Sequence, residues 1–434
     1  MRKLLLALLL AASSQAVAQQ ERIAITGGKV VTNGGAPIEG GVVLISGGSV
    51  ERVGPAGTAV PAGYRVIDAN GKWVTPGIIA GLSQFGAVEV SGVSSSNDLS
   101  ARQSPATAAL MLEGAFNPNE TSIPVGRIEG VTAAIVGPSP GRSLFAGQGY
   151  VLSLADGTTE PLRPRAFQYL VYGERGASLA GGSRPAAWIE ITNALEEAQR
   201  LLKGGAPSRD QSRDLRLAPE DAQALTLVLR GAQPLLVRAE RASDIRQVLK
   251  LPRMYPGIRL VLVSANEGWL VADEIARAGV PVITLGMNNR PDSFEAIGST
   301  MSNVGRLAAA GVKVALGVPD LDVSFQPRNL PHYAGNMVAQ ARLPGGVGLS
   351  WDQAFAAISR TPAEIFGLSD MGVLKPGAAA DVVVWSGDPL ELTTHAEQVI
   401  IRGVPQSLES RQTQLARRYQ PGRERTQLPE AYSR

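Results

Sequence analysis

The stretch Trp73-Val74-Thr75-Pro76-Gly77-Ile78-Ile79-Ala80-Gly81-Leu82-Ser83-Gln84 marks a change in the pattern of the sequence. Between residues 22 and 74, short β-rich runs alternate with pairs of glycines, which is the pattern expected of hairpins. From residue 76 as far as residue 368, strand-like and helix-like runs alternate instead. The sequence therefore predicts an N-terminal β-domain at 19–75 and a larger α/β domain at 76–368.

The α/β domain consists of repeated units in which a strand is followed by a helix. Strand-like runs are found at residues 131–136, 234–237, 258–263, 282–285 and 312–316. Helix-like runs are found at residues 188–202, 242–250, 269–278 and 293–310. Such repeats favour a parallel sheet, and a TIM (β/α)8 barrel is the commonest way to bury many of them in one domain. A doubly wound open sheet would fit the same periodicity.

The C-terminal region returns to the β-rich pattern of the N-terminus. The runs at 381–385 and 399–403 are rich in valine and isoleucine, which favour strands. We therefore expect residues 19–75 and 369–407 to form one composite domain, a small β-sandwich beside the barrel. The remaining segment, 408–434, is charged and is expected to be a tail that could begin with a helix.

The first 18 residues have the features of a secretory signal. Arg2 and Lys3 precede an apolar run too short to span a bilayer, and Ala16-Val17-Ala18 matches a small-residue cleavage site. Removal of residues 1–18 leaves 39 of the 41 basic residues against 38 acidic ones, so charge gives no reason to expect nucleic-acid binding. We expect a secreted or periplasmic protein with no membrane span once the signal is removed.

Four stretches resemble the amidohydrolase superfamily and follow one another in the order found there: residues 74–79, 130–134 with 145–149, 234–245 and 348–385. The last stretch is the most specific, because it ends in the run Gly372-Val373-Leu374-Lys375-Pro376-Gly377-Ala378-Ala379-Ala380-Asp381. The resemblance spans nearly the whole mature chain. It implies a TIM barrel beside a split β-domain, hydrolysis of carbon–nitrogen bonds, and one or two divalent metals such as zinc inside the barrel.

The metal ligands of that family are missing at the positions where the resemblance places them. Its two histidines on the first barrel strand fall on Leu82 and Gln84, and the histidine of a later strand falls on Arg238. An apolar side chain and a cation cannot replace neutral imidazoles. The chain also has no cysteine and only two histidines, His332 and His395. We therefore predict no metal ligand and no metal cofactor.

Other parts of the family's site are altered as well. The histidine of the strand after Arg238 would fall near residues 264–266, where no histidine is present. The aspartate that activates water in the family should follow Gly317, but Val318-Pro319 stand there and Asp320 lies slightly further along. A bridging lysine has no candidate. Asp320 is therefore the candidate catalytic residue.

Gln84, Arg238 and His332 are the candidates for ligand binding. Arg238 ends an apolar strand, where the mouth of a barrel should lie, and could accept an anion there. The alternative is an ion pair with Glu240 or Asp320 that fills the space of the metal. His332 could be a general base, or it could have a structural or surface role.

These observations leave two functional hypotheses. The first is an exported homologue that has lost the metal site and binds a small molecule, or an amidohydrolase-like partner chain, through the barrel mouth. The second is an active hydrolase of small amides, cyclic amides or dipeptides whose rebuilt site uses Gln84, Asp320 and nearby carboxylates. An oligomer is compatible with either hypothesis.

Overall fold

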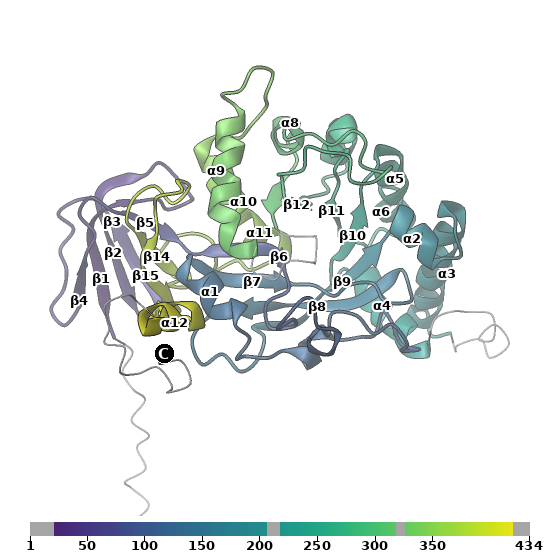
Figure 1. Ribbon diagram of the computed structural model, residues 1–434, viewed down its shortest axis with the longest axis horizontal. Helices are drawn as coiled ribbons and strands as arrows, with labels where there is room; N and C mark the ends of the chain where they lie inside the picture. The colour runs from purple at the N-terminus through teal and green to yellow at the C-terminus, as the bar shows by residue number, and fades with distance from the viewer. Residues whose placement is uncertain (1–20, 206–217, 318–325, 420–434) are drawn as a thin grey trace, which may run out of the picture.

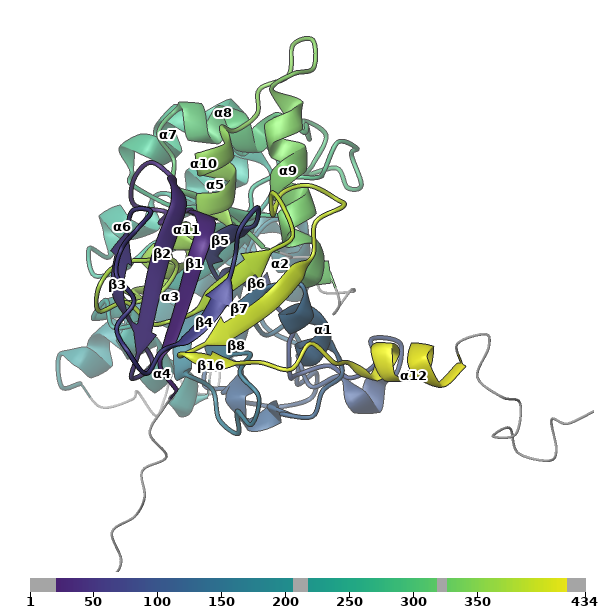
Figure 2. The same cartoon turned by 90° about the vertical axis from the view of Figure 1, so that its left-hand side faces the viewer.

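Two eight-stranded β-sheets organise the described part of the chain, which comprises residues 21–205, 218–317 and 326–419 of a computed structural model. One of them, the composite sheet, collects strands from both ends of the chain, and the other curves into the barrel (Figure 1). Figure 2 looks onto the composite sheet, where the purple N-terminal strands lie beside the yellow C-terminal ones.

The composite sheet has the strand order β16-β15-β14-β5-β1-β2-β3, and β4 pairs with β1. Its strands are β1 (Ile23–Val30), β2 (Ile38–Ser46), β3 (Ser49–Gly54), β4 (Arg65–Asp68), β5 (Trp73–Pro76), β14 (Val382–Trp385), β15 (Ala396–Ile401) and β16 (Val404–Pro405). The two ends of the chain meet where β5 pairs antiparallel with β14, with Val74 opposite Val384. Both valines are buried in the core of this sheet, which confirms that the termini share one domain.

A glycine pair fixes the hairpin between β2 and β3. Gly47 and Gly48 have φ angles of 58° and 79°, in the left-handed region that glycine adopts without strain. Two consecutive residues of this kind form the turn that matches the right-handed twist of the flanking strands. The hairpin that the glycine pairs predicted is therefore present here.

The second sheet has the strand order β13-β12-β11-β10-β9-β8-β7-β6. Its strands are β6 (Ile78–Ser83), β7 (Val131–Val136), β8 (Phe145–Ser153), β9 (Arg163–Val171), β10 (Leu235–Ala239), β11 (Leu260–Ser264), β12 (Val282–Thr284) and β13 (Val314–Leu316). The edge strands β6 and β13 approach so closely that a Cβ atom on Gly81 would overlap the carbonyl oxygen of Leu316. The predicted barrel is thus present and nearly closed.

One strand of the barrel departs from the repeated strand-then-helix pattern. β8 pairs antiparallel with both β7 and β9, whereas the other neighbours pair parallel. The connections on either side of β8, residues 137–144 and 154–162, are too short for the crossover that parallel strands need. The barrel therefore contains a three-stranded meander at β7–β9.

Helices cover the outside of the barrel (Figure 1). The α-helices are α1 (Ser122–Ile128), α2 (Glu174–Leu179), α3 (Arg184–Leu202), α4 (Pro219–Leu229), α5 (Ala242–Val248), α6 (Leu251–Met254), α7 (Ala272–Arg277), α8 (Asn303–Ala309), α9 (Leu330–Gln340), α10 (Trp351–Ala357), α11 (Arg360–Phe366) and α12 (Arg411–Tyr419). Short 3-10 helices are η1 (Ser94–Ser96), η2 (Leu112–Ala115), η3 (Gly268–Val271) and η4 (Gln326–Asn329). No helix in the described ranges is long and apolar enough to cross a membrane.

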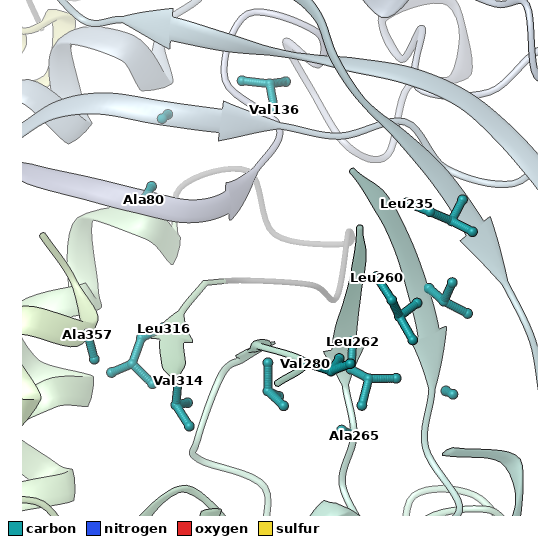
Figure 3. Packing of buried hydrophobic residues seen from close by; sticks show 14 of the residues in the cluster. Ala80, Val136, Leu235, Leu260, Leu262, Ala265, Val280, Val314, Leu316 and Ala357 are labelled. Carbon is teal, nitrogen blue, oxygen red and sulfur yellow. The ribbon is translucent and has the colours of Figure 1, made fainter. Parts of the chain in front are cut away.

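An apolar layer lies between the strands and these helices. Figure 3 shows part of it, with Leu235 of β10, Leu260 and Leu262 of β11, and Leu316 of β13. Along each strand these residues alternate with residues of a second apolar cluster, which lies inside the barrel and includes Leu236. The alternation decides which side chains of a strand reach the interior and hence the barrel mouth.

The prediction of one long helix over residues 293–310 is wrong for its first half. Only Asn303–Ala309 is helical, and residues 285–302 form an irregular segment after β12, the cover segment. Side chains hold this segment in place: Glu267 accepts a hydrogen bond from the Gly298 amide, and the indole of Trp269 donates to the Gly298 carbonyl. These long-range contacts satisfy backbone groups that a helix would have used.

Candidate functional site at the barrel mouth

Arg238 and Glu240 lie at the carboxyl end of β10 and point into the barrel. They are two residues apart, so a strand places them on the same face, and the next inward residue below them is Leu236 of the interior cluster. Arg238 Nε donates to Glu240 Oε1 over 3.0 Å, with 29% of the arginine side chain and 4% of the glutamate side chain exposed. The sequence interpretation of an ion pair with Glu240 is confirmed.

Glu240 is a buried carboxylate with several donors around it. Besides Arg238, the Asn266 amide donates to Oε2 over 3.3 Å, and the Ser264 hydroxyl also hydrogen-bonds the carboxyl group. Burial raises the pKa of Glu240 above its ordinary value, and Arg238 opposes that rise more than any other neighbour. The charge of this group is therefore balanced mainly by the guanidinium next to it.

The end of β11 has an unusual backbone that serves this arrangement. Ser264 and Ala265 have φ angles of 67° and 48°, which side chains with a Cβ rarely adopt. The left-handed bend lets both Ser264 and Asn266 reach Glu240 from the neighbouring strand. Backbone strain of this kind is concentrated at functional sites in proteins, which makes the end of β11 part of the candidate site.

A cavity of about 430 Å³ opens above these residues, and we call it the mouth pocket. It is lined by Arg238, Glu240, Ser264, Asn266, Thr284, Leu285, Met287, Asn288, Asp292, Ser293 and Glu295. These residues lie at or directly after the carboxyl ends of three neighbouring parallel strands, β10 to β12, or belong to the cover segment. The carboxyl ends of barrel strands are where such folds carry their ligand sites.

Glu295 brings a second buried carboxylate to the mouth pocket. Its Oε2 accepts hydrogen bonds from the Glu174 amide over 2.6 Å and from Arg184 Nη2 over 3.2 Å. Burial raises the pKa of Glu295, the charges of Glu240 and Glu174 add to that rise, and Arg184 counteracts it. The same Arg184 also pairs through Nε with Asp244, which is buried as well.

The sequence-predicted ligand residues separate in space. Arg238 lines the mouth pocket, whereas Gln84, buried directly after β6, and His332, partly exposed on α9, are not among the lining residues. Asp320, the candidate catalytic residue, lies outside the described residues. The roles of these four side chains in ligand binding or catalysis stay predictions.

The residues at the family's metal positions do not fit a metal centre. Leu82 is fully buried in the interior cluster, where its side chain packs beside Gly137 and Phe167. Arg238 supplies a guanidinium, which has no lone pair to offer a cation. Within the described ranges there is no group of three or more histidine, cysteine, aspartate or glutamate residues arranged to hold a metal ion.

Glu295 was missed in the sequence because residues 293–310 were interpreted as a helix, and Asp292, directly before that stretch, was not singled out. A turn-forming run, Asn288-Asn289-Arg290-Pro291-Asp292-Ser293, leads into the stretch. Asparagine, proline and aspartate in succession favour turns and disfavour a continuous helix. That run was the available signal that this segment folds over the barrel mouth.

Comparison with known proteins agrees with this architecture. A model described as amidohydrolase family matches residues 242–405. The amidohydrolase of Thermotoga maritima, a solved structure, is 23% identical, with a TM-score of 0.77 over 88% of this chain and 99% of that one. Residues 242–405 are thus similar to the amidohydrolase family, and the fold of the chain is similar to that of a solved amidohydrolase. The solved structure of molinate hydrolase is 16% identical, with a TM-score of 0.55 over 90% of this chain and 95% of that one.

A curated relative that is named an amidohydrolase is longer than this chain. It is amidohydrolase tasK of Hapsidospora irregularis, which is 24% identical over 402 residues. The match covers 84% of this chain but only 40% of the tasK protein, so this chain corresponds to less than half of that relative. The matches support a scaffold similar to that of amidohydrolases.

Proposed function

We propose that this chain binds a small amide in the mouth pocket without the metal centre of the amidohydrolase superfamily. The observation that supports the proposal best is the Arg238–Glu240 ion pair, which occupies a position that the resemblance gives to a metal-binding histidine. A guanidinium at that position repels a divalent cation instead of binding it. The replacement of a metal-binding histidine by an arginine fits a protein that descends from hydrolases and binds a ligand without a metal.

The mouth pocket offers groups that suit an amide. The carboxamide of Asn266 and the hydroxyl of Thr284 line it, and neither side chain hydrogen-bonds another described residue. Together they supply donors and acceptors for a ligand's carbonyl oxygen and N–H group. A volume of about 430 Å³ is at the small end of ligand pockets, which favours a small amide, a cyclic amide or a dipeptide.

We further propose that this binding takes place outside the cytoplasm. The support is the signal-like sequence at residues 1–18, a region that lies outside the described residues. The test is the N-terminal sequence of the exported protein, expressed with its own leader. Cleavage after Ala18 is the expected result, and retention of Met1 in a cytoplasmic fraction would contradict it.

A paired experiment tests ligand binding and metal independence together. Butanamide, hydantoin and glycylglycine are titrated into the mature chain by calorimetry after dialysis against a chelator, and metal content is measured on an undialysed sample. Asn288→Trp places an indole in the mouth pocket and is expected to abolish binding. Arg290→Trp, at a neighbouring exposed position that does not line the pocket, is the matched control and should bind as the unmodified chain does.

The alternative, an active hydrolase with a rebuilt site, would be favoured by a different result. In that case the chain would hold one or two metal ions tightly, and the chelator would abolish amide turnover. Loss of that turnover in Asp320→Ala would then assign the catalytic role that the sequence suggests for this residue. Binding of an amide to the metal-free chain, with no turnover, is the result that we expect.

A further inference from the structure

The mouth pocket contains more negative than positive charge. Arg238 is the one cationic residue among the described residues that line it, and it already pairs with Glu240. Two further carboxyl groups, those of Glu295 and Asp292, line the same cavity. A ligand that enters therefore meets carboxylates that the lining itself does not neutralise.

The excess charge is located most clearly at Glu295. Among the described residues, Arg184 is the single cation that contacts it, and Arg184 also pairs with the buried Asp244, so one guanidinium serves two carboxylates. Only one of the two Glu295 oxygens, Oε2, receives these hydrogen bonds. Oε1 accepts none from the described residues, although the side chain is only 10% exposed.

A partly compensated carboxylate in such a position is costly unless something supplies the missing charge. Burial raises the pKa of Glu295, and the charges of Glu240 and Glu174 act in the same direction. A cation that contacts Oε1 would remove this penalty and form a charge-assisted hydrogen bond in a site shielded from water. Thr284, whose exposed fraction is 3%, also indicates that this cavity takes a ligand, because its hydroxyl hydrogen-bonds none of the described residues.

We propose that the mouth pocket selects ligands that carry a protonated amine, which binds between Glu295 Oε1 and the Asp292 carboxylate. The inference rests on the proposed function, because it names the class of amide that the same pocket takes: amides with an ammonium group. The amide end lies toward Asn266 and Thr284, and the ammonium end lies toward the cover segment. Arg238 and Glu240 neutralise each other beneath the ligand.

Three probes of nearly equal size test the charge preference directly. They are 3-aminopropanamide, butanamide and succinamate, in which an ammonium, a methyl and a carboxylate group occupy the same end of the molecule. We expect the ammonium probe to bind at least about tenfold more tightly than butanamide, and succinamate to bind most weakly. Binding is measured by calorimetry at low ionic strength with the mature chain at neutral pH.

Two variants test which carboxylates cause the preference for the ammonium probe. Glu295→Gln should reduce the ratio between the affinities for the ammonium probe and for butanamide to near one. Asp292→Asn, at an exposed position where the substitution leaves the core intact, should reduce the ratio two- to fivefold. Glu391→Gln removes one exposed negative charge in the composite domain and is the matched control, for which no change in the ratio is expected.

The outcomes separate this inference from the proposed function. Equal affinity for 3-aminopropanamide and butanamide would overturn the ammonium preference and leave amide binding in the pocket standing. A preference that persists in both Glu295→Gln and Asp292→Asn would overturn the assigned position. Failure of all three probes to bind, or binding that survives Asn288→Trp, would overturn the proposed function together with this inference.

Discussion

The barrel mouth and the junction between the two sheets each bury a carboxylate, but they compensate it differently. At the mouth, Glu240 has Arg238, the Asn266 amide and the Ser264 hydroxyl around it. At the junction, Asp381 precedes β14, and its Oδ1 accepts one backbone hydrogen bond from Arg402, over 2.8 Å. Its Oδ2 is buried and accepts none from the described residues.

The pKa values reflect this difference in compensation. Burial raises the pKa of Asp381 from 3.8 to about 6, and the amide and the charge of Arg402 oppose the rise only in part. For Glu240 a full guanidinium opposes the same effect of burial. Burial thus raises the pKa of both carboxyl groups, and the two places differ in what opposes the rise: an ion pair and two further hydrogen bonds at the mouth, and one backbone hydrogen bond together with the charge of Arg402 at the junction.

The largest expected effect comes from breaking the ion pair at the mouth. Arg238→Met leaves the buried Glu240 without its cation, which should lower the free energy of unfolding by roughly 2–4 kcal/mol at pH 8. The loss should be smaller at pH 5, because Glu240 can take up a proton and lose its charge. Urea denaturation at both pH values measures the difference.

The double variant Arg238→Met with Glu240→Leu is the control for this prediction. It replaces both charges with apolar groups, which removes the uncompensated carboxylate and should recover part of the stability. A double variant that is as unstable as the single one at pH 8 would show that Arg238 stabilises the chain through packing rather than through its charge.

The fold could be predicted from local pattern because each strand carries its own signal. Residues 131–136 were expected to form a strand and form β7 with the same limits, since a short run of β-branched and apolar residues needs no distant partner to be recognised. β8 and β9 were not predicted, because Gly147 and Gly149 interrupt the alternation in β8. Their pairing depends on short connections rather than on composition.

The site was only partly predictable for a related reason. Arg238 and Glu240 are two residues apart on one strand, so their pairing could be proposed from spacing alone. Glu295 depends on Arg184, which is 111 residues away in the sequence, and no local pattern indicates that contact. Residues 318–325, which include Asp320, lie outside the described ranges, so the interpretation of that residue stays a prediction.

A second, smaller effect should appear at the junction between the sheets. Since the pKa of Asp381 is raised in the folded chain, its contribution to stability is full below about pH 4 and is lost as the pH rises through about 6. Asp381→Asn is neutral at every pH and should not show this loss. Between pH 4 and pH 8 the unmodified chain should therefore lose roughly 1–3 kcal/mol relative to the variant.

Thermal or urea unfolding across that pH range checks the prediction for the junction. Asp352→Asn, an exposed aspartate on α10, is the matched control and should follow the pH profile of the unmodified chain. Parallel profiles for the unmodified chain and Asp381→Asn would mean that the pKa of Asp381 is not raised in the folded state.

The smallest effect concerns the hydroxyl that supports Glu240. Ser264→Ala removes one hydrogen bond to the carboxyl group and should lower the free energy of unfolding by about 1 kcal/mol at pH 8. The effect should shrink at pH 5, because the hydroxyl lowers the pKa of Glu240 and therefore stabilises its ionised form. Ser293→Ala removes a hydroxyl that lines the same pocket without a hydrogen bond to a described residue, and it should change stability little. Equal losses in the two variants would show that the hydroxyl of Ser264 acts by filling space, and that Arg238 and the Asn266 amide alone compensate the buried charge.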